Sequence, residues 1–364
     1  MITLKSKWTM QEANDWYNKL GWLRGCNFIG SDCTNRLDMW QSYKSEEKLK
    51  TADRELALAN KIGFNTVRLW ANFDVYYAEP ESFMAIFERY ISLCHKHNQR
   101  VMIVLGYEED LPRGDVFVPK KMGEQEYALG EHQGRIPLTE EQKSMEPHHY
   151  MEYPELKDKF IQMVQGIVRK YRNDERIFCW NVWNEPGIER GEIAVEFLDT
   201  IFEAVRAEDP VQPLCADIWR GLKGGIPFSK EERRALELSD VISFHSYSEY
   251  RWFVENLTEL KKFNRPIFVT EWLHRINHNN IAEIYPLLYM ENIANYCWGF
   301  VLGKTQTHEP WPCMWDEYYS GKRSDYDFTK WQHDLFRPNL RPYDPREIEI
   351  IEHFNKLADK NAEN

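Results

Sequence analysis

Two glutamates stand at the ends of short apolar segments, where a carboxyl group could do chemistry. Glu185 follows the run Ile-Phe-Cys-Trp-Asn-Val-Trp (177–183) within the motif Trp-Asn-Glu-Pro, and Pro186 prevents a strand from continuing. Glu271 belongs to a second such run, Pro-Ile-Phe-Val-Thr-Glu-Trp (266–272). Two facing carboxyl groups can break a glycosidic bond, because one protonates the leaving oxygen while the other attacks the sugar or activates water. The pair therefore predicts acid–base chemistry on a glycoside, if the fold brings both side chains together.

The segments around these glutamates alternate between short apolar runs and longer stretches with helical periodicity. This alternation indicates parallel strands joined by helices. Eight strands are predicted, over Leu23–Ile29, Thr66–Trp70, Arg100–Leu105, Ile177–Val182, Gln212–Ile218, Val241–His245, Ile267–Glu271 and Cys297–Leu302. A nucleotide-binding open sheet would usually carry a glycine-rich loop after its first strand, and no GxGxxG follows here. We therefore expect an α/β fold, a single (β/α)8 TIM barrel, with its site at the carboxyl ends of the strands.

The rest of the chain fits one domain. A capping box at Thr9 and Glu12 predicts an N-terminal helix at about residues 9–20, which ends at Gly21. Two connections are unusually long, residues 106–153 after the third strand and residues 304–344 after the eighth, and such loops often shape a substrate cleft. Without an internal repeat or a linker, residues 1–364 are predicted to form a single catalytic barrel domain.

The interval between the two glutamates matches about three strand–helix units, which puts them on the fourth and seventh strands, across the barrel mouth from each other. Trp-Asn-Glu-Pro after the fourth strand and Glu-Trp after the seventh resemble the clan A glycoside hydrolases, in particular the cellulase-like family 5. The resemblance covers nearly the whole chain. It implies a retaining β-glycosidase with Glu185 as the general acid/base and Glu271 as the nucleophile.

The same resemblance implies substrate-binding residues at other strand ends. They are Arg68 in Thr-Val-Arg-Leu-Trp, Asn184 at the sugar 2-hydroxyl, His245 and Tyr247 in Ser-Phe-His-Ser-Tyr, and Trp298 as the floor under the reacting sugar. One position departs from the family pattern, because Gly106-Tyr107 stands where many members have histidine; Tyr107 is kept as a substrate-binding candidate. Trp219, Trp272, Trp311 and Trp315 fit either sugar platforms or packing between loops, and Asn27, Asp32 and Trp40 are further candidates for the pocket.

The expected roles agree with simple electrostatics. Arg68 within reach of Glu271 would lower the pKa of that carboxyl group, and the phenol of Tyr247 would donate to it. Glu185 must begin protonated, and it can act as a base once Glu271 has lost its charge in a glycosyl ester. This order of events retains the anomeric configuration.

Composition narrows the choice of partners. The formal net charge is -12 without a continuous basic stripe, which argues against nucleic acid and anionic membranes and favours a carbohydrate substrate. The 14 tryptophans supply flat faces on which sugar rings can stack. The first residues lack the pattern of an export signal, and Cys26, Cys179, Cys215 and Cys297 fall in apolar segments as expected of buried free thiols. A cytoplasmic, reducing location is therefore expected.

Other readings of the sequence remain open at this stage. An exo-acting glycosidase is preferred, with an endo-acting β-1,4-glycanase or a non-catalytic sugar-binding barrel as alternatives. A metal-dependent barrel hydrolase would need histidine and aspartate ligands at several strand ends, and only His245 fits. His132, His148 and His149 match no zinc spacing and are expected in a solvated loop. No metal or cofactor is therefore predicted, and the sugar is left open.

Overall fold

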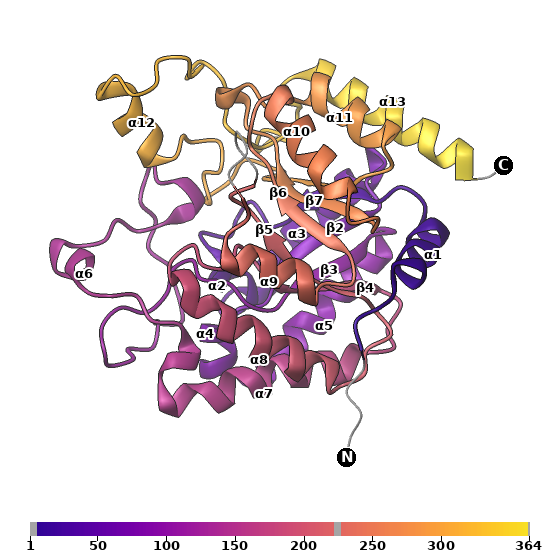
Figure 1. Cartoon of the computed structure of the whole chain (residues 1–364). Helices are drawn as coiled ribbons and strands as arrows, with labels where there is room; N and C mark the ends of the chain where they lie inside the picture. Colours follow the sequence, from indigo (N-terminus) through magenta and orange to yellow (C-terminus); the bar gives the residue numbers. More distant parts are fainter. Residues whose placement is uncertain (1–5, 222–226, 363–364) are drawn as a thin grey trace.

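The computed structural model describes residues 6–221 and 227–362, and in these residues eight parallel strands close into a barrel (Figure 1). Each strand pairs with the next along the chain, and β1 pairs with β8 to close the ring. The strands are β1 (Arg24–Asn27), β2 (Thr66–Trp70), β3 (Arg100–Val104), β4 (Ile177–Trp183), β5 (Leu214–Ile218), β6 (Ile242–His245), β7 (Ile267–Trp272) and β8 (Ala294–Cys297). The predicted (β/α)8 barrel is confirmed.

Seven of the strands lie within two residues of their predicted bounds, and the eighth does not. The prediction placed it over Cys297–Leu302, whereas β8 ends at Cys297. The chain turns at Gly299, whose φ of +74° favours glycine, and a Cβ there would lie only 2.6 Å from a carboxylate oxygen of Asp334. The apolar residues after this turn therefore belong to the loop, where Val301 bridges to Phe336.

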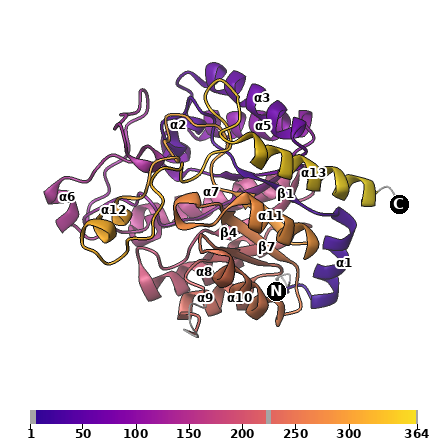
Figure 2. The same cartoon turned by 90° about the horizontal axis from the view of Figure 1, so that it is seen from above.

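Helices surround the barrel and bury the apolar stripes seen in the sequence (Figure 2). In α5, Pro80 occupies the first turn, and Phe83, Phe87 and Tyr90 face the core. The described helices are α1 (Met10–Leu20), α2 (Arg36–Trp40), α3 (Ser45–Lys61), α4 (Phe73–Ala78), α5 (Pro80–Lys96), α6 (Glu140–Ser144), α7 (Pro154–Tyr171), α8 (Ala194–Arg206), α9 (Lys230–Leu238), α10 (Tyr250–Lys261), α11 (Ile281–Met290), α12 (Pro312–Tyr319) and α13 (Pro345–Ala362). No helix among the described residues is both long and apolar enough to cross a membrane.

The N-terminal helix α1 covers the end of the barrel at which the strands begin. Thr9 and Glu12 form the expected capping box, and Gly21 follows the helix with φ of +72°. Ala13 and Tyr17 pack with strand residues such as Phe178 and Phe268 in a separate apolar cluster. This end of the barrel is therefore sealed, and the site must open at the other end.

The two long connections lie away from α1 in both views (Figures 1 and 2). Residues 105–153 carry the short helix α6 and two single 3-10 turns, and residues 298–344 carry α12. Both loops follow the carboxyl ends of their strands, as predicted. They rise over the mouth of the barrel.

Cysteines behave as the sequence suggested. Six free cysteines are buried, including Cys26, Cys179, Cys215 and Cys297, and Cys313 is exposed. The cytoplasmic location itself stays a prediction, and residues 1–5, on which the export-signal interpretation depends, lie outside the described residues.

Candidate active site

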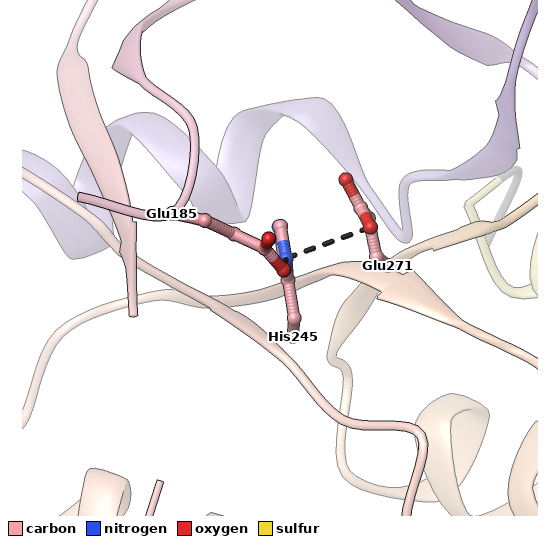
Figure 3. Close-up of side chains that lie close together, drawn as sticks. All are labelled: Glu185, His245 and Glu271. Atoms are coloured by element: carbon pink, nitrogen blue, oxygen red, sulfur yellow. Dashed lines mark hydrogen bonds and ion pairs between the residues drawn. The ribbon is translucent and has the colours of Figure 1, made fainter. Parts of the chain in front are cut away.

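Glu185, His245 and Glu271 meet at the carboxyl ends of β4, β6 and β7 (Figure 3). One carboxylate oxygen of each glutamate and a ring nitrogen of His245 all lie within 4.8 Å of one another. Figure 3 shows the ring of His245 between the two carboxyl groups. Residues from three strands, distant in the sequence, thus form one cluster as predicted.

Both carboxylate oxygens of Glu271 accept hydrogen bonds. Nη1 of Arg68 donates to Oε1 at 2.9 Å, and the hydroxyl of Tyr247 donates to Oε2 at 2.7 Å. Burial and the charge of Glu271 raise the pKa of Tyr247 well above its usual value, so the phenol keeps its proton. The two donors fix the orientation of the Glu271 carboxylate.

The pKa of Glu271 moves opposite to the sequence-based expectation. The predicted contact with Arg68 exists, and both His245 and Arg68 lower this pKa. Burial of the carboxyl group is the larger effect, and the charge of Glu185 adds to it, so the pKa of Glu271 is raised overall. The sequence predicted the neighbours of Glu271 but not the extent of its burial.

Arg68 connects most of the polar residues in the barrel mouth. Its guanidinium is completely buried and donates to Asn27, Asn181 and Asn184 besides Glu271. Nη2 also lies 2.7 Å from Oδ2 of Asp217 on β5.

Asp217 was missed in the sequence, although it is the only charged residue of β5 and thus carried a signal. Burial alone would raise its pKa. The charges of Arg68 and His245 instead hold the pKa of Asp217 well below the usual range. Asp217 therefore stays ionised and balances the charge of Arg68.

His245 is positively charged at neutral pH. Burial alone would lower its pKa, but the charges of Glu271, Asp217 and Glu185 raise the pKa of His245 to about 10. Its Nδ1 lies 2.6 Å from Oε1 of Glu185, and its Nε2 lies 3.6 Å from Asp217. A protonated imidazole donates from both nitrogens. His245 can therefore donate a hydrogen bond to Glu185.

The backbone at Glu185 is held in an unusual conformation. Its φ is +47°, in the left-handed region, where a residue other than glycine is strained. Glu108, from the loop after β3, accepts hydrogen bonds from the backbone amides of Gly187, Glu189 and Arg190 at 2.8–2.9 Å. Glu108 thereby fixes the turn that presents Glu185, a role that was not predicted from the sequence.

An aromatic cluster lies beside the carboxylates. Trp298 follows β8 directly, is 3% exposed, and packs edge-on against Trp70. Tyr107 packs against the same Trp70 and accepts a hydrogen bond from Asn72. Tyr107, Tyr247 and Trp298 therefore belong to one apolar cluster. A cavity with room for about one water molecule adjoins Trp70 and Trp298.

The other candidate tryptophans divide between the site and the core. Trp219 donates to the carbonyl of Pro186, next to Glu185, and the ring of Trp311 lies 5.1 Å from that of Tyr247. Trp272 is fully buried, because it follows the inward-facing Glu271 on β7 and must point outward to the helices, so it is not a sugar platform. Trp315 stacks on Phe328 in the segment around α12. Of the first-strand candidates, Asn27 contacts Arg68, while Asp32 binds Thr51 and Trp40 is buried against α5.

The histidines of the long β3 loop are not solvated as a group. His149 is completely buried against Trp183 and Phe197, and His132 is 4% exposed beside Trp311. Burial lowers the pKa of both rings to about 3, so they are neutral. The expectation of a solvated loop was wrong here, because the loop folds back onto aromatic side chains.

The sequence model for cellulase, described as glycosyl hydrolase family 5, matches residues 25–303. The chain belongs to glycosyl hydrolase family 5. As a member of this family it is a glycoside hydrolase, as the sequence predicted. A search of curated protein sequences found no match to the chain.

Solved structures with a similar fold include a mannosidase and two mannanases. They are an exo-β-1,4-mannosidase from Opitutaceae bacterium strain TAV5 (TM-score 0.57, 14% identity, 94% of this chain and 61% of that one), an endo-β-1,4-mannanase from Thermotoga petrophila (0.55, 14%, 92% and 77%) and a β-1,4-mannanase from the sea hare Aplysia kurodai (0.54, 13%, 76% and 88%). The chain thus spans 61% of the length of the first of these enzymes. At these identities the likeness concerns the fold.

Proposed function

We propose that this family 5 enzyme removes terminal β-linked sugars by double displacement, with Glu185 as the general acid/base and Glu271 as the nucleophile. The separation of the two carboxyl groups carries the assignment. Their nearest oxygens lie within 4.8 Å. Retaining enzymes hold these groups about 5–5.5 Å apart, whereas inverting enzymes need about 6.5–9.5 Å to admit a water molecule.

In the first step, Glu271 attacks the anomeric carbon while Glu185 gives its proton to the leaving oxygen. The bond between that carbon and the oxygen breaks, and a glycosyl ester of Glu271 forms. Arg68 and Tyr247 hold the attacking carboxylate in place. His245 donates to Oε1 of Glu185, which leaves Oε2 to carry the proton.

In the second step, Glu185 acts as a base. It takes a proton from water, the water oxygen bonds to the anomeric carbon, and the ester bond to Glu271 breaks. The imidazolium of His245, 2.6 Å from Glu185, stabilises the carboxylate that Glu185 has become. Two inversions at the same carbon return the β-configuration.

Three loops support exo action, because they are tied together along one side of the site. In the β3 loop, Gly123 exchanges two hydrogen bonds with Gln41, at 2.7 and 2.8 Å. The same loop donates from the backbone amide of Gly130 to Gln306 of the β8 loop at 2.7 Å, and Lys304 donates to the carbonyl of Ser31 at 3.0 Å. These bonds join the β1, β3 and β8 loops on one side of the site. We infer that the joined loops close one end of the substrate cleft, as exo action requires.

We further propose that the sugar is a β-mannoside. The support is the similarity of fold to an exo-β-1,4-mannosidase and to two β-1,4-mannanases. Mannosides therefore come first in a substrate panel, with glucosides, galactosides and xylosides beside them.

The test is hydrolysis of 4-nitrophenyl β-glycosides, followed by proton NMR of the first sugar product. We expect the β-mannoside to react fastest and β-mannose to form first. A mannotetraose labelled at its reducing end then distinguishes the modes of action. Exo action gives a labelled trisaccharide first, whereas labelled disaccharide as the first product would contradict the exo proposal, and α-mannose would contradict double displacement.

A further inference from the structure

Arg36 lies beside Trp70 and Trp298, and its two terminal nitrogens make no hydrogen bond among the described residues. It begins α2, after β1, and is 8% exposed. Its guanidinium carbon lies 3.6 Å from the ring centre of Trp70 and 5.9 Å from that of Trp298. Neither Nη1 nor Nη2 has a hydrogen-bond partner among the described residues. Attraction to the aromatic faces offsets part of the cost of burying this charge but leaves the donors unused.

Glu109 supplies an unused acceptor next to these donors. It follows β3 in the long loop and is 7% exposed. Its Oε1 accepts from Nδ2 of Asn184 at 2.9 Å and lies 3.6 Å from Nη2 of Arg36. Its Oε2 has no hydrogen-bond partner within the described ranges. A series of contacts therefore links Arg68, which donates to Glu271, to Arg36 beside Trp70. The intermediate residues of this series are Asn184 and Glu109.

The chemistry of the pair matches neighbouring hydroxyl groups. A hydroxyl both donates and accepts, so it can give its proton to Glu109 and accept one from Arg36. An anionic sugar would meet the carboxylate of Glu109, which works against a uronic acid. Buried polar groups without partners carry a large desolvation cost, and hydroxyls that pair with them recover part of it.

The order of residues assigns the two hydroxyls. The family resemblance puts Asn184 at the 2-hydroxyl of the reacting sugar, and Asn184 donates to Glu109, which lies 3.6 Å from Arg36. With the sugar in that position, we expect Glu109 to face the 3-hydroxyl and Arg36 the 4-hydroxyl. In a β-1,4-linked chain the 4-hydroxyl is free only on the terminal sugar.

We propose that Glu109 and Arg36 bind the 3- and 4-hydroxyls of the terminal, uncharged sugar whose bond is cleaved, and so select the chain end. The proposal rests on the double-displacement function assigned above. It adds two specificity-determining residues outside the proposed catalytic pair. Both residues are nearly buried, Arg36 at 8% and Glu109 at 7% exposed, so little bulk water competes for their polar atoms.

The test compares 4-nitrophenyl β-mannoside with its 3-deoxy and 4-deoxy analogues. We expect the wild type to lose roughly 10- to 100-fold in kcat/KM for each missing hydroxyl, the usual range for a hydrogen bond to a charged group. In Arg36→Met the 4-deoxy analogue should react about as fast as the parent glycoside, and in Glu109→Gln the loss for the 3-deoxy analogue should shrink. Wild-type discrimination in both variants would overturn the proposal.

Controls separate this result from misfolding and from failure of the proposed function. Arg24→Lys changes another buried arginine near a tryptophan, at the opposite end of the barrel. This variant should keep the wild-type ratios of kcat/KM between the parent glycoside and its deoxy analogues. If Arg36→Met does not fold, Arg36→Lys is measured instead. This variant should discriminate less than the wild type between the parent glycoside and its 4-deoxy analogue, and unchanged discrimination counts against the proposal.

Failure of the catalytic assignment is detected separately. Undiminished activity of Glu185→Gln or Glu271→Gln would show it, whatever the ratios of kcat/KM between the parent glycoside and its deoxy analogues. If 4-nitrophenyl glycosides do not react, calorimetric binding of methyl β-mannoside and its 4-deoxy analogue makes the same comparison.

Discussion

Arg68 and Asp217 form an ion pair of 2.7 Å in which both side chains are completely buried. The same guanidinium donates to Glu271. Asp217 also accepts from the hydroxyl of Thr270 at 2.7 Å. The orientation of the proposed nucleophile therefore depends on a residue of β5 that does not contact it.

Removing the charge of Asp217 should destabilise the protein. Asp217→Asn removes one of the carboxylates that balance the buried charge of Arg68. Breaking a buried ion pair typically costs about 3–5 kcal/mol of unfolding free energy. Urea denaturation measures the loss. Glu352→Gln, which removes an exposed pair with Lys356 on α13, is the control and should leave the midpoint nearly unchanged. Equal midpoints for both variants would contradict the central role of Asp217.

Tyr247→Phe should move the acidic limb of the pH profile. The lost hydroxyl donates to the charged form of Glu271 and lowers its pKa, so its removal raises that pKa further. We expect the acidic limb of kcat/KM to shift to higher pH, with a roughly 10- to 100-fold lower maximum. Tyr107→Phe, which loses only a contact with Asn72, should leave the limb in place. An unshifted limb in Tyr247→Phe would show that Glu271 does not govern it.

Glu108→Gln should impair proton donation more than attack. A glutamine cannot accept from all the backbone amides that Glu108 now holds, so the turn that presents Glu185 loosens. We expect a large loss of kcat/KM for glycosides with poor leaving groups and a small one for 2,4-dinitrophenyl glycosides, which need no protonation. A series of leaving groups measures the difference. A uniform loss across the series would point to general disruption of the site.

The charge of His245 should make stability fall at alkaline pH. The pKa of His245 is raised to about 10 in the folded protein, whereas it is about 6.5 in an unfolded chain. The charged imidazole therefore contributes its full stabilisation of the folded state below pH 6.5. This stabilisation is lost progressively as the pH rises through 10. The difference in unfolding free energy between the wild type and His245→Gln should therefore shrink between pH 6.5 and 10. A difference that stays constant over this range would mean that His245 is not held in its charged form.

The sequence predicted the parts of the site that lie at strand ends. Apolar runs that stop at Asn184-Glu185-Pro186 and at Glu271-Trp272 indicate both the strands and the carboxylates at their ends. Pro186 marks the first of these ends, because proline cannot continue a ladder. Arg68, His245 and Tyr247 followed from the family resemblance. The resemblance also placed Trp298 in the site, but the strand predicted through this residue was wrong. β8 ends at Cys297, and the positive φ at Gly299, where the chain turns, cannot be predicted from an apolar run.

Residues whose roles depend on long loops were harder to predict. Glu108, Glu109 and Arg36 reach the site only because the β3 loop folds against the β1 loop, and no periodicity encodes that contact. Asp217 was detectable in principle as a charge within an apolar strand. The raised pKa of Glu271 required knowledge of its burial, which depends on the packing of the whole barrel mouth.

Azide rescue of the two glutamate variants tests the central assignment most directly. With an activated β-mannoside, Glu185→Ala should form the β-mannosyl azide, because azide replaces water on the ester of Glu271. Glu271→Ala should form the α-mannosyl azide, because azide replaces the missing nucleophile on the opposite face. These two products would establish both roles, whereas the same azide anomer from both variants, or full activity without azide in either, would contradict them.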